Sequence, residues 1–200
     1  HLTEYQNANY AKRYTDFVAS FDGALREAVA LGYHKLLSYK DEYEVARLLI
    51  DTRRQAEAEF VGKLKLTHHL APPLRSRNGT NGRQHKIVMP AFIIKIFPLL
   101  ACMKGLRGPV LDVFGRTAYR ILERALIAEY EADMIKLRRF IRSNCIEAPV
   151  AFARLPPAIR GFGQVEIANV GKAAKRREAL IMVLNVYVVV VTSNRDAVLE

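Results

Sequence analysis

Basic side chains gather in one stretch of this 200-residue sequence. Residues 62–111 contain nine lysines and arginines but no aspartate or glutamate. A run of one sign attracts anions or an acidic surface unless carboxylates from elsewhere in the protein meet it. The basic residues of this acid-free stretch are Lys63, Lys65, Arg75, Arg77, Arg83, Lys86, Lys95, Lys104 and Arg107.

Three interpretations of the acid-free stretch remain open. The first 61 residues contain 8 basic and 10 acidic residues, and the remaining 139 contain 23 basic and 10 acidic, so the acidic first third could fold against the stretch. A neighbouring domain outside this sequence could supply the carboxylates instead. The third interpretation is an anion site for a phosphorylated cofactor, an acidic protein or nucleic acid, in that order, because the basic residues are not interleaved with stacking aromatics. The candidate residues for binding an anion or a partner are Lys63, Lys65, His69, Lys104, Arg107, Arg116 and Arg120.

Histidines and cysteines predict neither a metal site nor a nucleophile. His68 and His69 are adjacent, so on a strand they point to opposite faces, and no cysteine or carboxylate accompanies them at ligand spacing. Cys102 and Cys145 lie 43 positions apart with no CxxC pair, which excludes a disulfide scaffold, a structural zinc site and a self-contained iron–sulfur cluster. We therefore predict no catalytic residue and no metal site in this chain.

Charged residues at helical spacing have structural explanations. Asp41, Glu42 and Glu44 occupy the first turn of an expected helix, where carboxylates interact favourably with the helix dipole. Arg116 and Arg120 belong to a ridge of arginines four residues apart. Like charges at this spacing cost a few tenths of a kcal/mol per pair unless a negative group meets them.

The composition indicates a packed globular domain. Half of the residues are hydrophobic and 26% are charged, which is close to the globular average. The sequence starts at His1 without a recognisable signal peptide, and its longest apolar run, at 180–191, is shorter than the roughly 20 residues of a membrane helix. We expect a single mostly helical domain spanning residues 1–200, a fragment of a larger cytoplasmic protein without a membrane or nucleic-acid partner.

Hydrophobic periodicity predicts the elements of the first half. Apolar residues at steps of three and four predict helices at about 10–21, 24–39 and 41–61. The period changes to two at 63–70 and again at 85–89, with turn-forming Asn–Gly pairs between these segments. The two segments predict a small β-hairpin.

The second half is expected to provide the spine of the fold. Pro90 stands at a good first position for a largely buried helix at 91–104 that Pro98 would kink. An unbroken helical pattern at about 114–142 predicts a helix about 43 Å long. A short helix ending at Leu155, a last helix at about 164–183 and a buried or pairing strand in the valine-rich run 186–191 complete the prediction. The predicted fold class is mostly α, a helical bundle around the long helix with the hairpin at one side.

Several motifs, in order along the chain, resemble one known family. They are YKDEYEVARLL at 39–49, KLKLTHHLAPP at 63–73, KGLRG at 104–108, DVFGRTA at 112–118, ERALIAEYE at 123–131, LPPAIRGFGQV at 155–165 and ANV at 168–170. Together they resemble the C-terminal domain of the fused indolepyruvate ferredoxin oxidoreductases, members of the 2-oxoacid:ferredoxin oxidoreductase family. The resemblance covers about residues 2–177 and fades in the valine-rich tail.

The resemblance implies a parent enzyme that decarboxylates aryl pyruvates oxidatively, forms aryl-acetyl-CoA and passes electrons to ferredoxin. Thiamine diphosphate with magnesium and iron–sulfur clusters would be held by other domains, with coenzyme A as co-substrate, and no catalytic residue carries over to this chain. Interdomain or subunit docking is then the expected role, with the other domains of the parent as partners and a homodimer as one form of assembly. The alternative role is an anion-binding module for the phosphates of coenzyme A or for acidic ferredoxin.

Overall fold

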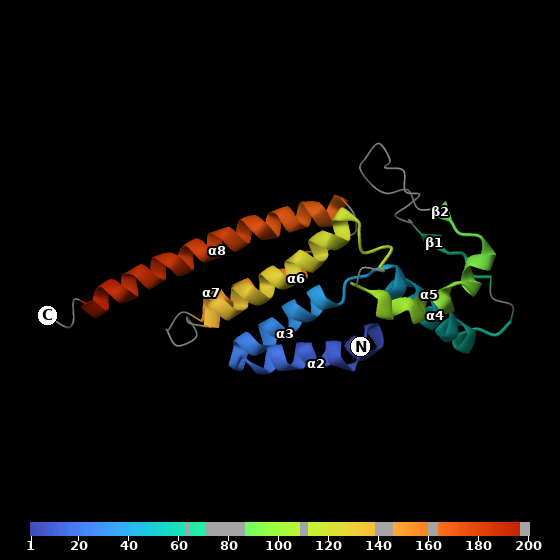
Figure 1. Ribbon diagram of the computed structural model, residues 1–200, viewed down its shortest axis with the longest axis horizontal. Coiled ribbons are helices and arrows are strands. Elements are labelled where there is room, and N and C mark those ends of the chain that lie inside the picture. The colour runs from blue at the N-terminus through green and yellow to red at the C-terminus, as the bar shows by residue number, and fades with distance from the viewer. Residues whose placement is uncertain (63–64, 71–86, 109–111, 139–145, 160–163, 197–200) are drawn as a thin grey trace. The chain divides into compact units, whose positions relative to one another are not determined.

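A computed structural model shows a mostly helical chain with one small two-stranded antiparallel sheet (Figure 1), which confirms the predicted fold class. The structure describes residues 1–62, 65–70, 87–108, 112–138, 146–159 and 164–196. The chain divides into two compact units. Unit 1 comprises His1–Arg13 and Ser38–Ala125, and unit 2 comprises Tyr14–Leu37 and Leu126–Glu200.

Unit 1 is built around the contact between helix α4 (Glu42–Glu59) and helix α5 (Phe97–Cys102) (Figure 1). Helix α4 begins where the sequence predicts, because the carboxylate of Asp41 accepts a hydrogen bond of 2.8 Å from the backbone N–H of Glu44. This cap satisfies one of the unpaired donors of the first turn. The elements that lie wholly in unit 1 are α1 (Leu2–Tyr5), α4 (Glu42–Glu59), β1 (His69–Leu70), β2 (Ile87–Val88), η1 (Ala91–Lys95), α5 (Phe97–Cys102) and η2 (Met103–Leu106).

The hairpin is shorter than predicted. Strands β1 and β2 pair antiparallel, with His69 opposite Val88 and Leu70 opposite Ile87. The N–H of Met89 extends the ladder by donating to the carbonyl of His68 at 2.8 Å. Residues 65–68 are not in a strand, and 63–64 and 85–86 lie outside the described residues. Alternation of apolar residues therefore indicated the pairing but overestimated its length.

The predicted helix at 91–104 is three short pieces rather than one kinked helix. Pro98 stands in the first turn of α5, where its missing N–H breaks no intrahelical hydrogen bond, so the proline starts a new helix after η1. Only one face of this segment is covered. Phe97 is buried, whereas Phe92 and Leu99 are 62% and 64% exposed, so the expectation of a largely buried helix is wrong.

Helix α6 (Ala118–Leu137) is the predicted spine, but it has 20 residues and is about 30 Å long. It begins at Ala118 rather than at about residue 114, because the side chain of Asp112 accepts hydrogen bonds from the backbone N–H groups of Phe114 and Gly115 at 3.2 and 3.0 Å. These bonds hold residues 113–117 in turns outside the helix. At the other end, the predicted residues 139–142 lie outside the described part of the chain.

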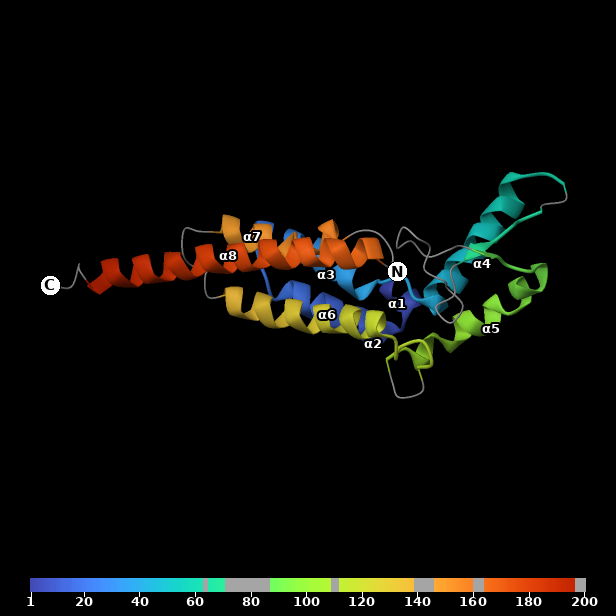
Figure 2. The same cartoon turned by 90° about the horizontal axis from the view of Figure 1, so that it is seen from above.

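Unit 2 packs helices α3 (Gly23–Leu37), α7 (Glu147–Ala153) and α8 (Gln164–Asp196) together with the short turn η4 (Pro156–Ala158) (Figure 2). Helix α2 (Ala8–Ala19) and α6 each contribute residues to both units. Tyr130 on α6 donates a hydrogen bond of 3.1 Å to the carbonyl of Ala153, which ties α6 to the end of α7. The deeply buried side chains of unit 2 include Phe21, Leu25, Val29, Tyr33, Leu37, Met134, Phe152 and Leu184.

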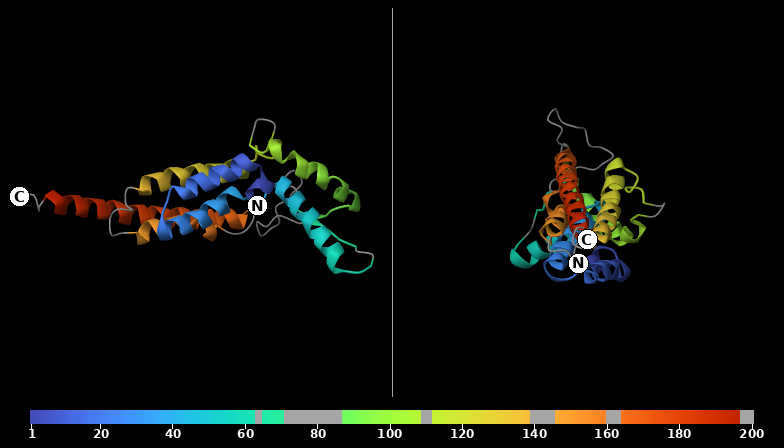
Figure 3. Two further views of the ribbon diagram at one scale, coloured as in Figure 1. Left: turned by 90° about the horizontal axis from the view of Figure 1, so that it is seen from below. Right: turned by 90° about the vertical axis from the view of Figure 1, so that its left-hand side faces the viewer.

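Helix α8 is longer than predicted and includes the valine-rich run. It has 33 residues and ends at Asp196, so the predicted strand at 186–191 is wrong. Within unit 2, its C-terminal half extends past the other helices (Figure 3). β-branched residues cost only a few tenths of a kcal/mol each in a helix, and no glycine or proline interrupts residues 172–196. The preference of valine for strands is therefore too weak to end a helix that is already formed.

A close approach of α3 to α7 explains why residue 32 is a glycine. A Cβ atom at Gly32 would collide with the carbonyl oxygen of Ala153 and the hydroxyl of Tyr130. Gly32→Ala should lower the free energy of unfolding by about 1–3 kcal/mol, as measured by urea denaturation. Gly171→Ala on α8 is the control, because no atom lies within 4 Å of the added methyl group. It should raise stability by about 0.5–1 kcal/mol, and equal effects at both positions would contradict the close approach.

Candidate functional site

Arg107 follows η2 and is buried against the acidic first third of the chain. Its Nε and Nη2 donate to the two carboxylate oxygens of Asp41, the second at 2.9 Å. Its Nη1 donates to the carbonyl of Tyr5 and to Oε1 of Gln6, both at 2.6 Å, and its Cζ lies 3.7 Å from the centre of the Tyr5 ring. All three nitrogens of the guanidinium group donate within unit 1, and the Tyr5 ring stacks against the group.

Arg120 on α6 is buried in a second internal ion pair. Its Nη1 donates to Glu123 at 2.5 Å, its Nη2 donates to the carbonyl of Lys40 at 3.1 Å, and Oε2 of Glu42 lies 3.5 Å from Nη2. Arg107 and Arg120 were both predicted as binding residues. Their charges are met by carboxylates of the same unit, so the first interpretation of the sequence, folding of the acidic first third against the basic stretch, holds for Arg107.

The other predicted binding residues are spread along unit 1. Lys65, His69 and Arg116 are exposed. Lys104 is half-buried, and its Nζ donates to the carbonyl of Glu4 at 2.5 Å. Lys63 lies outside the described residues. Of the six predicted residues that the structure describes, Lys104, Arg107 and Arg120 bond to groups of unit 1, whereas Lys65, His69 and Arg116 are exposed.

The sequence analysis missed a group of exposed apolar side chains within residues 88–99 of unit 1. We call it the α5 surface and define it by Val88, Phe92, Ile96 and Leu99, which are 61%, 62%, 44% and 64% exposed, together with the exposed Lys95. The buried Phe97 holds the segment in place, with the His68 ring at 5.4 Å in an edge-on contact. The signal that could have found the α5 surface is that every residue of 91–101 except Lys95 is apolar, which is more than one buried helix face requires.

Three buried tyrosines surround the Arg107 ion pair and its neighbour Asp112. The hydroxyl of Tyr5 donates to the carbonyl of Tyr39 at 2.9 Å, and that of Tyr43 donates to Asp112 at 3.1 Å. Burial raises the pKa of Tyr39 to about 12. Burial raises the pKa of Tyr5 further, and burial together with the hydrogen bond to Asp112 raises that of Tyr43. All three phenols therefore stay protonated near neutral pH, and those of Tyr5 and Tyr43 serve as hydrogen-bond donors rather than as general bases.

The described part of the chain contains neither a cluster of metal ligands nor a helix that could span a membrane. No group of three or more histidine, cysteine, aspartate or glutamate side chains there is placed to hold a metal ion. None of the helices in those residues combines the length and hydropathy that crossing a bilayer requires.

A family model described as "Family of unknown function (DUF6537)" matches residues 1–179 of the chain. No curated protein and no solved structure matches it. The matched region includes all of the described part of unit 1 and ends within α8, before the valine-rich run.

Proposed function

The chain belongs to the DUF6537 family, and we propose that it is a non-catalytic docking domain of a larger enzyme, binding its partner through the α5 surface. The motifs at 39–49, 63–73, 104–108 and 155–165 support indolepyruvate ferredoxin oxidoreductase as that enzyme. Its thiamine diphosphate, magnesium and iron–sulfur clusters belong, in this proposal, to the other domains. We propose a cytoplasmic location on the same grounds.

The exposure of Phe92 and Leu99 is the observation that carries this proposal. Each of these side chains leaves more than three-fifths of its surface in water, although burying such a side chain fully is worth about 1.5–3 kcal/mol. Several large apolar residues exposed along one short segment are typical of a surface that a partner covers. A covering partner would gain this free energy on binding.

Charge specifies what kind of partner fits the α5 surface. Lys95 lies between the apolar side chains and is the one charged residue among those that define the surface. A complementary surface therefore presents apolar side chains surrounded by aspartate or glutamate. Such a partner would be steered by attraction at a distance and held by apolar contact.

Binding of coenzyme A phosphates is the weaker alternative. A phosphate site requires several donors that converge on one anion. Arg107 and Arg120, the strongest candidates, already donate to Asp41 and Glu123. An acidic ferredoxin remains a second protein partner that the α5 surface would fit, and the experiment below separates it from the other domains of the enzyme.

The docking proposal predicts that Leu99→Ser weakens binding of this chain to the separately produced catalytic remainder of the oxidoreductase. The expected loss is about tenfold in Kd, because a central apolar contact is worth 1–2 kcal/mol, measured by biolayer interferometry. Leu31→Ser is the control, because Leu31 is the same residue type with almost the same exposure, 63%, but lies on α3 of unit 2. Equal losses for both variants, or no binding of the wild-type chain, would refute docking through the α5 surface.

A matched pair of variants, Lys95→Glu and Lys136→Glu, tests the electrostatic part of the proposal. Lys95→Glu should slow association about three- to tenfold at low ionic strength and much less at 0.5 M salt. Lys136→Glu makes the same charge change at an exposed position of α6 in unit 2 and should leave the association rate nearly unchanged. If only ferredoxin binds, and Leu99→Ser weakens that complex, the surface docks the electron carrier and the interdomain role is refuted.

A further inference from the structure

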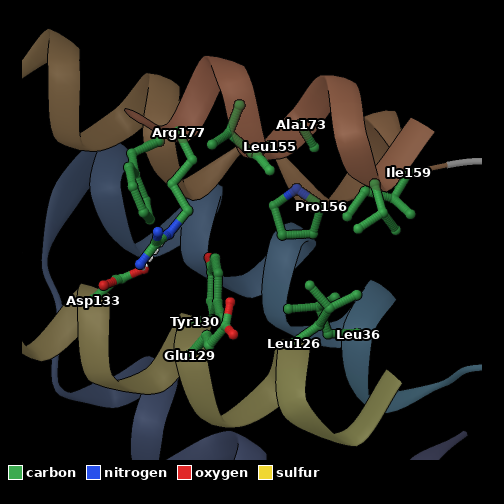
Figure 4. A pocket seen from close by; sticks show the side chains of 13 residues that line it. Leu36, Leu126, Glu129, Tyr130, Asp133, Leu155, Pro156, Ile159, Ala173 and Arg177 are labelled. Atoms are coloured by element: carbon green, nitrogen blue, oxygen red, sulfur yellow. Dashed lines mark hydrogen bonds and ion pairs between the residues drawn. The ribbon is translucent and has the colours of Figure 1, made fainter. Parts of the chain in front are cut away.

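A pocket of about 100 Å³ lies in unit 2 between α6 and α8 (Figure 4). Its apolar wall includes Leu36 from α3, Leu126 from α6, and Pro156 and Ile159 from the segment around η4. The pocket belongs wholly to unit 2, so it is separate from the α5 surface and does not depend on the docking proposal.

The pocket exists because α8 presents small side chains toward α6. Ala173 and Ala174 line it, one turn before Arg177 on the same helix. On the opposite side, Glu129 and Asp133 lie one turn apart on α6. Larger residues at 173 and 174 would fill the space between the two helices, so the alanines keep it open.

One end of the pocket is polar and rich in acceptors. Arg177 reaches from α8 to Asp133 (Figure 4), and both its Nε and its Nη2 lie 2.6 Å from the same oxygen, Oδ2. Glu129 is exposed and has no hydrogen-bonding partner among the residues that the structure describes. The hydroxyl of Tyr130 is already committed to the carbonyl of Ala153. Asp133 is therefore paired with Arg177, and Glu129 adds a second carboxylate to the pocket lining, so the charged lining residues are two carboxylates and one guanidinium group.

Size and charge together define the ligand class. A dry cavity of about 150 Å³ accommodates benzene, so a pocket of about 100 Å³ suits a branched alkyl group of about four or five carbons. The acceptor-rich end favours a cationic donor over an anion. We propose that this pocket binds a small primary alkylamine, with its alkyl group between Leu126, Pro156 and Ala173 and its ammonium group at Glu129 and Asp133.

Isothermal titration calorimetry of the full chain with isoamylamine, isoamyl alcohol and isovalerate tests this proposal at pH 7 and low salt. The three probes share an alkyl skeleton and differ only in the charge of the head group. Isoamylamine should bind in the millimolar range, at least fivefold more tightly than the alcohol, and isovalerate should bind more weakly than either. No heat of binding from isoamylamine at concentrations up to about 10 mM, or a preference for the alcohol or for isovalerate, would overturn the proposal.

Matched variants locate the binding. Ala173→Leu should fill the pocket and abolish the heat of binding, whereas Ala179→Leu, at an exposed position of α8 outside the pocket, should leave binding unchanged. Glu129→Gln replaces an exposed carboxylate without altering its size and should weaken isoamylamine up to about fivefold, so the test stands even if Ala173→Leu does not fold. Equal effects of the two leucine variants, or an unchanged affinity in Glu129→Gln, would contradict the assignment. Leu99→Ser should leave amine binding intact, which separates this result from the docking proposal.

Discussion

Replacing Arg107 with methionine is expected to lower the free energy of unfolding by about 3–5 kcal/mol. Arg107 and Asp41 are 8% and 3% exposed, and each is the principal charged partner of the other. Removing one member of a buried ion pair leaves the other charge desolvated without compensation. The substitution also removes the hydrogen bonds to Tyr5 and Gln6, and these bind the N-terminal segment to the end of η2.

Urea denaturation followed by circular dichroism measures this loss. Arg54→Met is the control, because the Arg54 side chain on α4 is 77% exposed and its replacement should change stability by no more than about 0.5 kcal/mol. Asp41→Asn tests the same pair from the other side, since asparagine can still cap α4 but removes the charge. If Arg107→Met were as mild as Arg54→Met, the ion pair would not stabilise unit 1.

Local patterns in the sequence predicted the helices well where the cause of a boundary is local. The start of α4 follows from the side chain of Asp41 and the backbone of Glu44, three residues apart. The delayed start of α6 depends on Asp112 bonding to the backbone at 114 and 115, and a helical pattern of apolar residues does not reveal this competition. The predicted strand at 186–191 was wrong for a similar reason, because helix propagation along α8 outweighs the weak preference of valine for strands.

The candidate site was harder to predict because its residues are defined by distant partners. Arg107 lies 66 positions from Asp41, so the sequence showed an unopposed positive charge where the structure shows a buried pair. The prediction for the α5 surface was wrong in the opposite sense, because the sequence predicted a buried helix where the structure shows exposed side chains. An apolar segment indicates burial whether the covering element belongs to the same chain or to another. The sequence therefore revealed the charge imbalance and the apolar segment. It did not reveal that the charge of Arg107 is paired inside unit 1 while apolar side chains such as Phe92 and Leu99 remain exposed.

Alkaline pH is expected to unfold unit 1 cooperatively. Tyr5, Tyr39 and Tyr43 are 0%, 7% and 2% exposed, and in the folded chain their pKa values are raised, to about 12 for Tyr39. In the unfolded chain the same phenols ionise near pH 10. Stability is therefore fully present below about pH 10 and falls above it, because the unfolded state releases protons that the folded state retains. Each tyrosine contributes about 1.4 kcal/mol of this loss at pH 11, and the three together about 4 kcal/mol.

Circular dichroism and phenolate absorbance, recorded together between pH 8 and 12, test this linkage. The buried tyrosines should ionise in the same steep transition in which helicity is lost. Tyr39→Phe is the informative variant, because no hydrogen bond of the Tyr39 hydroxyl is seen in the described residues, so the fold should tolerate its removal. It should reduce the pH dependence of stability by up to about 1.4 kcal/mol per pH unit between pH 10 and 12. Gradual ionisation of all nine tyrosines near pH 10, with helicity retained, would mean that water reaches these phenols. The Arg107 ion pair beside them would then also lie in contact with water. Its large expected effect on stability depends on low-dielectric surroundings, so that prediction would be wrong as well.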